Sequence, residues 1–471
     1  MPSPPTAPVH RLMRRENPWW DTGAIRPDYA AMKRRGRFPR FARLAEETGI
    51  RRAVLVMGPR RVGKTVLIHQ WVASLLERNL YRPREIAYLS LDQPLYTRLS
   101  LEELVEEARE AAGGRDELRV LALDEVPYLA GWERHLKAFV DTHPGVRCVA
   151  SGSAAAALRL RSTESGAGRF TDFLLPPLSF REFLDLQGAL LPAEPGDSAP
   201  PAAEIAAWNR YFLDYLNFGG FPEAFLAPAA RADSHRYIGL DVVRKVLTRD
   251  LAQLYGVQDV SELAALFTTL AGNTGREVSM DALSKQSGVS KPTLSRYLRY
   301  LEATFLIRRL RRIDASGRRF QRANHFKAYL TTPSLRSAIF GPVGPDDEAM
   351  GRLVETAVFA QDFAAGTELH YARWRERGSE GEVDFVHLGP GWKPDRAVEV
   401  KWSDRFARRP QELAGLAEFA RRHPKARVTL TTRSLGPASV DWPGTGMLRV
   451  LPASLHCYEA EFGDDDPPDR H

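Results

Sequence analysis

Residues 53–65 read A-V-L-V-M-G-P-R-R-V-G-K-T. The five apolar residues 53–57 form a short run that ends at a glycine, which predicts a buried strand. From Gly58 to Thr65 the sequence fits the pattern G-x-x-x-x-G-K-[ST], and residues 65–78 then have helical character. A strand, a glycine-rich loop and a helix in this order form the context in which the pattern binds phosphate groups. The stretch therefore predicts an α/β fold with a nucleotide site after its first strand.

The residue types in this loop suit a nucleoside triphosphate with a magnesium ion. Gly58 and Gly63 allow a tight turn, so that successive backbone amides and the start of the helix face the phosphate oxygens. Lys64 adds a positive charge at the β- and γ-phosphates, and the hydroxyl of Thr65 is a ligand for Mg²⁺. We expect ATP and Mg²⁺ to bind here, and the predicted binding residues are Gly58, Pro59, Arg60, Arg61, Val62, Gly63, Lys64, Thr65 and Val66.

A second motif completes a hydrolytic site. Residues 120–123 are apolar and are followed by Asp124 and Glu125, which we call the acidic pair. A buried strand delivers Asp124 to the carboxyl edge of the sheet, where it would hold Mg²⁺, and Glu125 would polarise the attacking water. The sequence therefore predicts hydrolysis of ATP to ADP, with Glu125 and Lys64 as catalytic residues.

Three further side chains are candidates for the same reaction. Residues 146–150 predict another strand, after which Ser151 and Ser153 are placed to sense the γ-phosphate or to orient water. The alternative for Ser153 is a helix N-cap. Arg169 is a candidate sensor arginine, or a trans-acting arginine that a neighbouring subunit of a homo-oligomer would supply. The alternative for Arg169 is an ordinary loop arginine.

Several shorter motifs follow the loop and the acidic pair. They are A-S-G-S at 150–153, G-R at 168–169, P-L-S-F-R-E-F at 177–183 and G-G-F-P at 219–222. With them the chain resembles the prokaryotic AAA-type (AAA+) P-loop ATPases whose C-terminal half is known only as a domain of unknown function. The resemblance implies an AAA+ ATPase module, a winged helix and a nuclease-like core. It leaves the cellular process open.

Residues 279–301 have the layout of two helices joined by a tight turn. Gly288 suits the left-handed turn, Ser290 suits the cap of the second helix, and Pro292 suits its first turn. The pattern predicts a helix-turn-helix, followed by an arginine-rich strand over 305–312 that resembles a wing. The predicted DNA contacts are Lys291, Thr293, Ser295, Arg296, Arg299, Arg308, Arg309, Arg311 and Arg312. The alternative is a winged helix used only for packing.

Two strand patterns occur further along the chain, at 382–386 and 397–401. Because side chains alternate between the faces of a strand, Glu399 and Lys401 should share one face. Asp384 precedes them at the distance that a hairpin gives. The sequence therefore predicts that these three charged side chains meet on one sheet.

An upstream helix over 351–363 adds Glu355 to this group. The Glu…Asp…Glu-x-Lys series resembles the PD-(D/E)xK nuclease core, although Val383 stands where that motif has proline. The resemblance implies that Asp384 and Glu399 bind a metal ion, and that the nuclease site consists of Glu355, Asp384, Glu399 and Lys401. The alternative is a surface ion pair on a fold that has lost its activity.

Composition limits the class of protein. The 471 residues carry a net charge of +7 and only two cysteines, Cys148 and Cys457, which makes a disulfide framework unlikely and favours a reducing cytoplasm. The chain has no apolar run long enough for a membrane helix, and we expect no signal peptide and no membrane partner. Basic blocks at 11–61 and 291–327 favour a polyanion partner such as DNA, the alternative being a solvated arginine-rich surface.

We predict an α/β architecture built on a P-loop NTPase parallel sheet. Its predicted parts are a basic helical extension (1–50), the ATPase domain (51–190), a helical lid (191–265), a winged helix-turn-helix (266–326), a restriction-endonuclease-like α/β domain (327–460) and a disordered tail (461–471). The functional prediction is an ATPase coupled to DNA binding or processing. The alternative is a nucleotide-dependent scaffold or switch for a protein partner, with an inactive nuclease-like domain.

Overall fold

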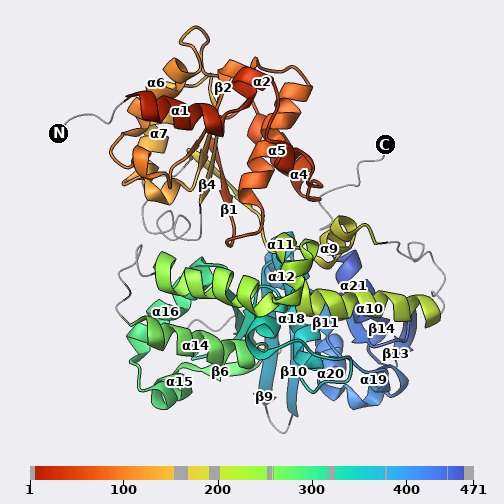
Figure 1. The fold of residues 1–471 in the computed structure, drawn as a ribbon. Helices are drawn as coiled ribbons and strands as arrows, with labels where there is room; N and C mark the ends of the chain where they lie inside the picture. The colour runs from red at the N-terminus through yellow and green to blue at the C-terminus, as the bar shows by residue number, and fades with distance from the viewer. Residues whose placement is uncertain are drawn as a thin grey trace. The chain divides into compact units, whose positions relative to one another are not determined.

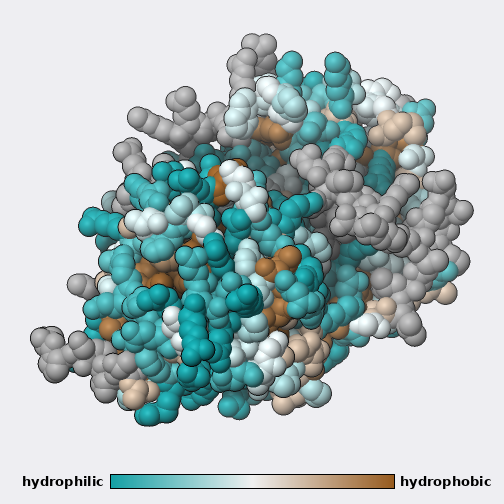
Figure 2. Space-filling view, turned by 90° about the horizontal axis from the view of Figure 1, so that it is seen from above, coloured by the Kyte–Doolittle hydropathy of each residue, from teal (hydrophilic) through white to brown (hydrophobic). Residues whose placement is uncertain are grey.

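The computed structural model describes residues 6–460 except 153–167, 190–201, 252–256, 258, 315, 318–323, 377–378 and 443. The chain divides into two compact units, Met1–Leu175 and Pro176–His471 (Figure 1). In the part of the chain that the structure describes, none of the helices combines the length and the apolar character needed to cross a membrane. On the face drawn in Figure 2, hydrophilic groups predominate among the described residues, and hydrophobic ones form small separate patches.

The first unit contains a five-stranded sheet in the order β2-β3-β4-β1-β5, with every pair of neighbours parallel. The strands are β1 Ala53–Met57, β2 Ile86–Ser90, β3 Val120–Asp124, β4 Arg147–Gly152 and β5 Phe170–Leu174. The helices after β1, β2 and β3 are α5 Lys64–Glu77, α6 Leu101–Ala111 and α7 Trp132–Thr142. β1 and β3 are buried along their whole length, as their apolar runs predict. β5 was not predicted.

Four short helices precede β1: α1 Thr6–Glu16, α2 Trp19–Thr22, α3 Pro27–Ala30 and α4 Phe38–Glu46. They agree with the predicted helical extension, and α1 buries apolar residues such as Val9 and Met13. The next segment lies along the free edge of β2. There the indole nitrogens of Trp19 and Trp20 donate to the carbonyl of Ile86, at 3.1 and 2.7 Å.

The second unit begins with helices. They are α9 Phe180–Gln187, α10 Ala202–Phe218, α11 Pro222–Leu226, α12 Pro228–Ala232, the helical segments η5 His235–Arg244 and η6 Val246–Asp250, and α14 Val260–Gly272. A nine-stranded sheet follows, in the order β13-β14-β12-β11-β10-β9-β7-β8-β6. The predicted division at 265/266 falls inside α14, and the division at 326/327 falls inside β8 His325–Leu330. Each boundary therefore divides one element, and at the second β8 is hydrogen-bonded to β7, which also pairs with β9.

The first third of this sheet comes with a helix pair. β6 Glu277–Ser279 leads into α15 Met280–Ser287 and α16 Lys291–Ala303, and β7 Ile307–Ile313 and β8 follow. Gly288 ends α15 with a φ of 71°, and Ser290 caps α16 through the amide of Thr293. Both features match the sequence prediction. β8 pairs antiparallel with β6 and with β7.

The rest of the sheet is interleaved with helices along the chain. Its elements are α17 Ser334–Phe340, α18 Met350–Ala365, β9 Leu369–Glu376, β10 Ser379–Leu388, β11 Pro394–Glu399, α19 Arg405–Arg408, α20 Ala414–Arg422, β12 Arg427–Thr432, β13 Ala438–Trp442, β14 Gly446–Pro452 and α21 Ala453–Glu459. β9, β10 and β11 are successive antiparallel neighbours, and β11 and β12 are parallel. α20 connects those parallel strands and buries Leu416 and Phe419 against the sheet.

Candidate functional site

The loop between β1 and α5 has the geometry of a phosphate cradle. Gly63 starts the helix with a φ of 94°, a conformation that favours glycine. At Gly58 an added Cβ would lie 2.0 Å from the carbonyl oxygen of Leu175, so only glycine fits. The buried Lys64 ammonium group donates to the carbonyls of Gly58 and Pro59, at 3.1 and 3.0 Å. The loop thus holds the positive charge of Lys64 against its own backbone carbonyls.

The acidic pair lies beside this loop, at the carboxyl end of β3. Asp124 is buried, and its carboxylate accepts hydrogen bonds from the hydroxyls of Thr65 at 2.7 Å, Tyr88 at 2.8 Å and Ser151. Glu125 has the left-handed φ of 54°, and its amide donates to the Ser151 hydroxyl at 3.2 Å. A left-handed conformation costs a non-glycine residue conformational free energy, and residues with such backbone strain are frequent at functional sites.

This donor set fits a magnesium ion. Thr65 and Asp124 were predicted as its ligands, and the structure brings their oxygens within 2.7 Å of each other. Both are oxygen donors, which Mg²⁺ prefers, and Mg²⁺ in such sites takes few protein ligands besides the substrate phosphates. The two residues that the sequence assigned to one metal ion therefore lie together.

Of the two further predicted catalytic groups, one lies at the predicted strand end and the other does not. Ser151 is fully buried near the end of β4, where its hydroxyl donates to Asp124 and accepts from the amide of Glu125; its part in the reaction stays a prediction. Arg169 precedes β5, which pairs in parallel with β1, so it lies at the amino edge of the sheet and forms an ion pair with Asp141. The phosphate loop is at the carboxyl edge, about 16 Å away for a five-residue strand. The sensor role of Arg169 in its own site is therefore wrong, and Ser153 lies outside the described residues.

Sequence reasoning missed three residues that support this site. The Tyr88 hydroxyl binds Asp124, and the buried Asn17 side chain donates to the Tyr88 carbonyl at 2.8 Å and accepts from its amide at 2.6 Å. The buried Arg35 donates to the carbonyl of Val62 in the phosphate loop, at 3.2 Å. The available signal for Tyr88 was a side chain with a hydroxyl group within the otherwise mostly apolar strand 86–90. Asn17 and Arg35 gave no signal, because their partners are distant in sequence.

The helix pair presents part of the predicted DNA-contacting set. On α16 the side chains of Lys291, Arg296 and Arg299 are exposed, while Thr293 and Ser295 are half-buried. Lys291 forms an ion pair with Asp281 of α15. The exposed face of this helix is therefore basic.

The predicted wing strand is in a different environment from the one expected. β7 lies inside the sheet between β8 and β9, and its arginines are mostly engaged within the protein. Arg309 forms an ion pair with Glu302 at 2.5 Å, Arg312 donates to the carbonyl of Arg373 at 2.9 Å, and Arg308 lies over the ring of Phe363. Arg311 is exposed and the other three arginines are half-buried, so internal contacts engage much of this strand, and its DNA contacts stay a prediction.

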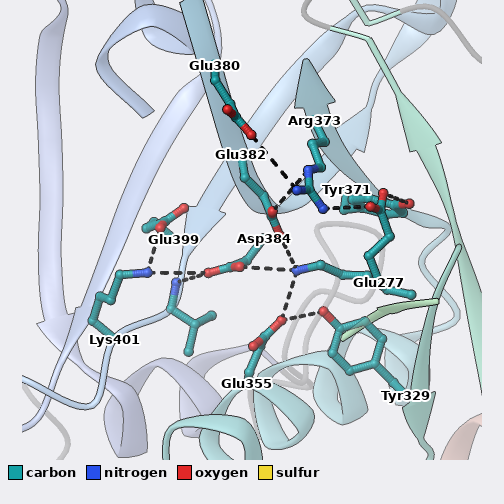
Figure 3. Close-up of polar contacts among 12 residues, drawn as sticks. Glu277, Tyr329, Glu355, Tyr371, Arg373, Glu380, Glu382, Asp384, Glu399 and Lys401 are labelled. Atoms are coloured by element: carbon teal, nitrogen blue, oxygen red, sulfur yellow. Dashed lines mark hydrogen bonds and ion pairs between the residues drawn. The ribbon is translucent and has the colours of Figure 1, made fainter. Parts of the chain in front are cut away.

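The predicted nuclease residues converge from three elements, as Figure 3 shows. Glu355 comes from α18, Asp384 from β10 and Glu399 from the end of β11, with Lys401 just beyond it. The Lys401 ammonium is 2.6 Å from Glu399 and 3.9 Å from Asp384, and the amide of Val400 donates to Asp384 at 2.9 Å. We call Glu355, Asp384, Glu399 and Lys401 the carboxylate cluster.

The electrostatics of this cluster favour a bound cation. Burial and the charge of Asp384 raise the pKa of Glu355 and of Glu399 to about 7. Lys327 and Lys401 lower the pKa of Asp384 despite its burial. Within the described residues, Oε2 of Glu399 is buried and has no hydrogen-bond partner. An unpaired buried carboxylate oxygen next to a second acid is a suitable metal ligand, so Asp384 and Glu399 fit the predicted metal ion.

Lys327 is the residue of this region that sequence reasoning missed. It lies on β8 with its side chain 4% exposed, and its ammonium group is 2.9 Å from Glu382, 3.3 Å from Glu355 and 3.4 Å from Asp384. The hydroxyl of Tyr329, also on β8, donates to Glu355. Alternation along H-F-K-A-Y-L places Lys327 and Tyr329 on one face, which was the available signal.

Comparison with known proteins supports the first unit's class. Residues 50–184 match the model of an AAA domain, which with the parallel sheet and the glycine-rich loop gives a P-loop NTPase fold. Residues 209–345 match a domain of unknown function, DUF8612. The AAA part of the predicted resemblance is thus confirmed, and the model for the following region assigns no activity.

Individual proteins resemble the chain more distantly. An uncharacterized protein of Haemophilus influenzae is 23% identical over 385 residues, which cover 80% of this chain and 88% of that protein. The Aeropyrum pernix ORC1 protein in complex with DNA is 16% identical, with 66% of this chain and 94% of that chain covered and a TM-score of 0.32. The ORC2 protein of the same organism is 14% identical, with 68% of this chain and 96% of that chain covered and a TM-score of 0.37. With TM-scores below 0.5, neither structure carries a functional conclusion.

Proposed function

We propose that the first unit binds ATP with Mg²⁺ and hydrolyses it to ADP. The observation that carries this proposal is the contact of 2.7 Å between Thr65 and Asp124, beside the buried Lys64. The AAA-domain match over residues 50–184 supports the same class of reaction. Bound Mg²⁺ would neutralise charge on the phosphates, while Lys64 stabilises the phosphoryl oxygens and Glu125 orients and polarises water.

Steady-state ATP turnover tests this proposal. Glu125→Gln keeps the size of the side chain but removes the base, so turnover should fall by about 100-fold or more while ATP still binds. Glu117→Gln is the matched control, because Glu117 is exposed shortly before β3 and should leave turnover unchanged. Equal turnover in the wild type and Glu125→Gln would contradict the proposed role of this residue.

We further propose that ATP hydrolysis is coupled to DNA. The order α14-β6-α15-α16-β7-β8, with β8 paired between β6 and β7, is typical of a winged helix, and the exposed face of α16 is basic. The double variant Arg296→Ala/Arg299→Ala should weaken DNA binding and lower the salt slope of log K by about 2. The double variant Arg408→Ala/Lys425→Ala removes two exposed charges elsewhere and serves as the control.

The alternative, a nucleotide-dependent scaffold for a protein partner, predicts different behaviour. ATP turnover would then be unaffected by any nucleic acid, and the loss of Arg296 and Arg299 would leave it unchanged. DNA-stimulated turnover that disappears in that double variant supports the coupled ATPase. Turnover without stimulation by duplex or single-stranded nucleic acid supports the scaffold.

A second candidate activity is metal-dependent hydrolysis of phosphodiester bonds at the carboxylate cluster. The unpaired Oε2 of Glu399 next to Asp384 favours it. A metal ion supplies stabilisation of the leaving oxygen when it is bound. Lys401, held by Glu399 at 2.6 Å, would place its charge next to the attacked phosphate.

Cleavage assays separate this activity from the ATPase. DNA cleavage that needs Mg²⁺ or Mn²⁺ should survive Lys64→Ala and disappear in Asp384→Asn. Lys393→Met, which alters an exposed lysine just before β11, should cleave like the wild type. If no divalent cation supports Asp384-dependent cleavage of any nucleic acid, the nuclease proposal is wrong and the cluster is structural.

A further inference from the structure

We propose that Lys327 fills, with its ammonium group, the position between Glu355 and Asp384 that a second divalent cation would take. The carboxylate cluster then holds a single metal ion, at Asp384 and Glu399. This inference rests on the proposed metal-dependent hydrolysis. It assigns Lys327 as a positioning residue that a neighbouring part of the sheet contributes.

Three acidic side chains engage the ammonium group of Lys327, two through hydrogen bonds and one through an ion pair. An ammonium group has three N–H donors, and three carboxylates surround this one: Glu382 at 2.9 Å, Glu355 at 3.3 Å and Asp384 at 3.4 Å. A cation bridging Glu355 and Asp384 would have to displace this nitrogen.

The backbone of β8 keeps Lys327 in place. Its residue partners are Leu310 on β7 and Glu277 on β6, so the strand is hydrogen-bonded on both sides at this register. A shift of one residue would move every side chain of β8 to the opposite face. The side chain is also almost fully buried, and its nitrogen lies 5.6 Å from the centre of the Tyr371 ring. Lys327 is therefore a fixed charge and not a mobile surface lysine.

Charge balance points to one ion. Four carboxylates, Glu355, Glu382, Asp384 and Glu399, face two ammonium groups, Lys327 and Lys401. One divalent cation changes the formal sum from −2 to 0, whereas two would raise it to +2 around side chains that are mostly buried. Excess buried charge is costly, so the second ion is disfavoured as long as Lys327 is present.

The orientation of the oxygens shows where the single ion belongs. Oδ1 of Asp384 faces Lys327, and Oε1 of Glu355 is used by Lys327 and by the Tyr329 hydroxyl. Oε2 of Glu399 is the buried oxygen of the cluster that has no partner in the described part of the chain. Glu355 is therefore expected to hold Lys327 rather than to bind metal.

The test is the number of Mn²⁺ ions bound per full-length chain without nucleotide, measured from the electron paramagnetic resonance signal of free Mn²⁺. Ions that remain in Asp384→Asn are subtracted, which removes any contribution of the phosphate loop. The wild type should bind one ion at the cluster. Glu355→Gln should still bind one, with affinity reduced by no more than about tenfold, and Glu399→Gln should bind none.

Variants of Lys327 complete the test. Lys327→Met should bind two ions at the cluster, whereas Lys327→Arg keeps the fixed charge and should bind one. Lys393→Met is the control and should bind one. Two ions in the wild type, or one ion in a folded Lys327→Met protein, would overturn the inference while leaving the proposed metal site intact.

The remaining outcomes are also decisive. If Lys327→Met does not fold, as judged by circular dichroism, Glu355→Gln decides: loss of the ion in that variant shows that Glu355 is a ligand and refutes the inference. If the wild type binds no ion that depends on Asp384, the proposed metal-dependent hydrolysis fails, and the inference fails with it.

Discussion

Replacing Asn17 by alanine should open the edge of the sheet that supports the acidic pair. β2 is the outer strand of the five-stranded sheet, so among the described residues its free side has no partner strand. The Asn17 side chain takes that place: it accepts from the Tyr88 amide at 2.6 Å and donates to the Tyr88 carbonyl at 2.8 Å. It also donates to Met13 at 2.7 Å, and it is fully buried. Alanine cannot form any of these hydrogen bonds.

The size of the effect follows from the groups left behind. The substitution leaves the amide and the carbonyl of Tyr88 buried without a partner, and each such group costs about 1–3 kcal/mol. Water that enters the vacated space offsets part of this cost, so we expect a loss of about 2–4 kcal/mol in the local stability of β2. Since about 1.4 kcal/mol is a factor of ten, amides of β2 should exchange about 30- to 700-fold faster.

Hydrogen exchange of peptides covering residues 86–90 measures this directly and does not require both units to unfold together. Thr22→Ala is the control, because Thr22 is exposed and its hydroxyl bonds only within its own short segment. It should change exchange by less than about threefold, as surface substitutions usually do. Exchange in Asn17→Ala within threefold of the wild type would show that Asn17 does not act as the missing strand.

Three further outcomes test other contacts. Tyr88→Phe removes one hydrogen bond to a buried carboxylate, worth about 1.5–3 kcal/mol, so ATP turnover should fall by roughly 10- to 100-fold while the melting profile keeps its shape. Gly58→Ala should abolish ATP binding in a calorimetric titration because the added Cβ would lie 2.0 Å from a backbone oxygen, whereas Gly49→Ala, with open space around it, should bind normally. Metal-free Glu399→Gln should melt increasingly above the wild type as pH rises from 5 to 7.5: burial raises the pKa of Glu399 from 4.5 to about 7, so the folded wild type loses a stabilising proton across that window.

The sequence was sufficient to predict those parts of the sites that depend on neighbouring residues or on the regular alternation of side chains along a strand. The phosphate loop needs only the order strand, loop, helix, and parallel strands necessarily bring Asp124 to the same edge as Thr65. In the second unit, period-two alternation and a hairpin placed Asp384, Glu399 and Lys401 together. The turn at Gly288 was equally predictable, because it depends on backbone conformation alone.

Other features depend on pairing between distant segments. β5 is short and half-exposed along most of its length, so its sequence F-T-D-F-L lacks the apolar run that marks β1. The role of Asn17 requires knowing that β2 is the outer strand. Arg169 was misplaced because a glycine-arginine motif does not show at which end of a strand it lies. In each case the position of the residue or strand depends on the strand order of the sheet, which cannot be inferred from the sequence pattern alone.

Strand pairing also explains why β7 and the carboxylate cluster belong to one structural unit. β7 pairs with β8 on one side and with β9 on the other, so one hydrogen-bonded sheet runs from the helix pair to the cluster. Glu302 of α16 fixes Arg309 of β7, and β8 delivers Lys327 to Asp384. A nuclease-like core that began at residue 327 would lose the strand that positions its own lysine. The helix pair and the carboxylate cluster are therefore joined by one hydrogen-bonded sheet, and β8 supplies a lysine to the cluster.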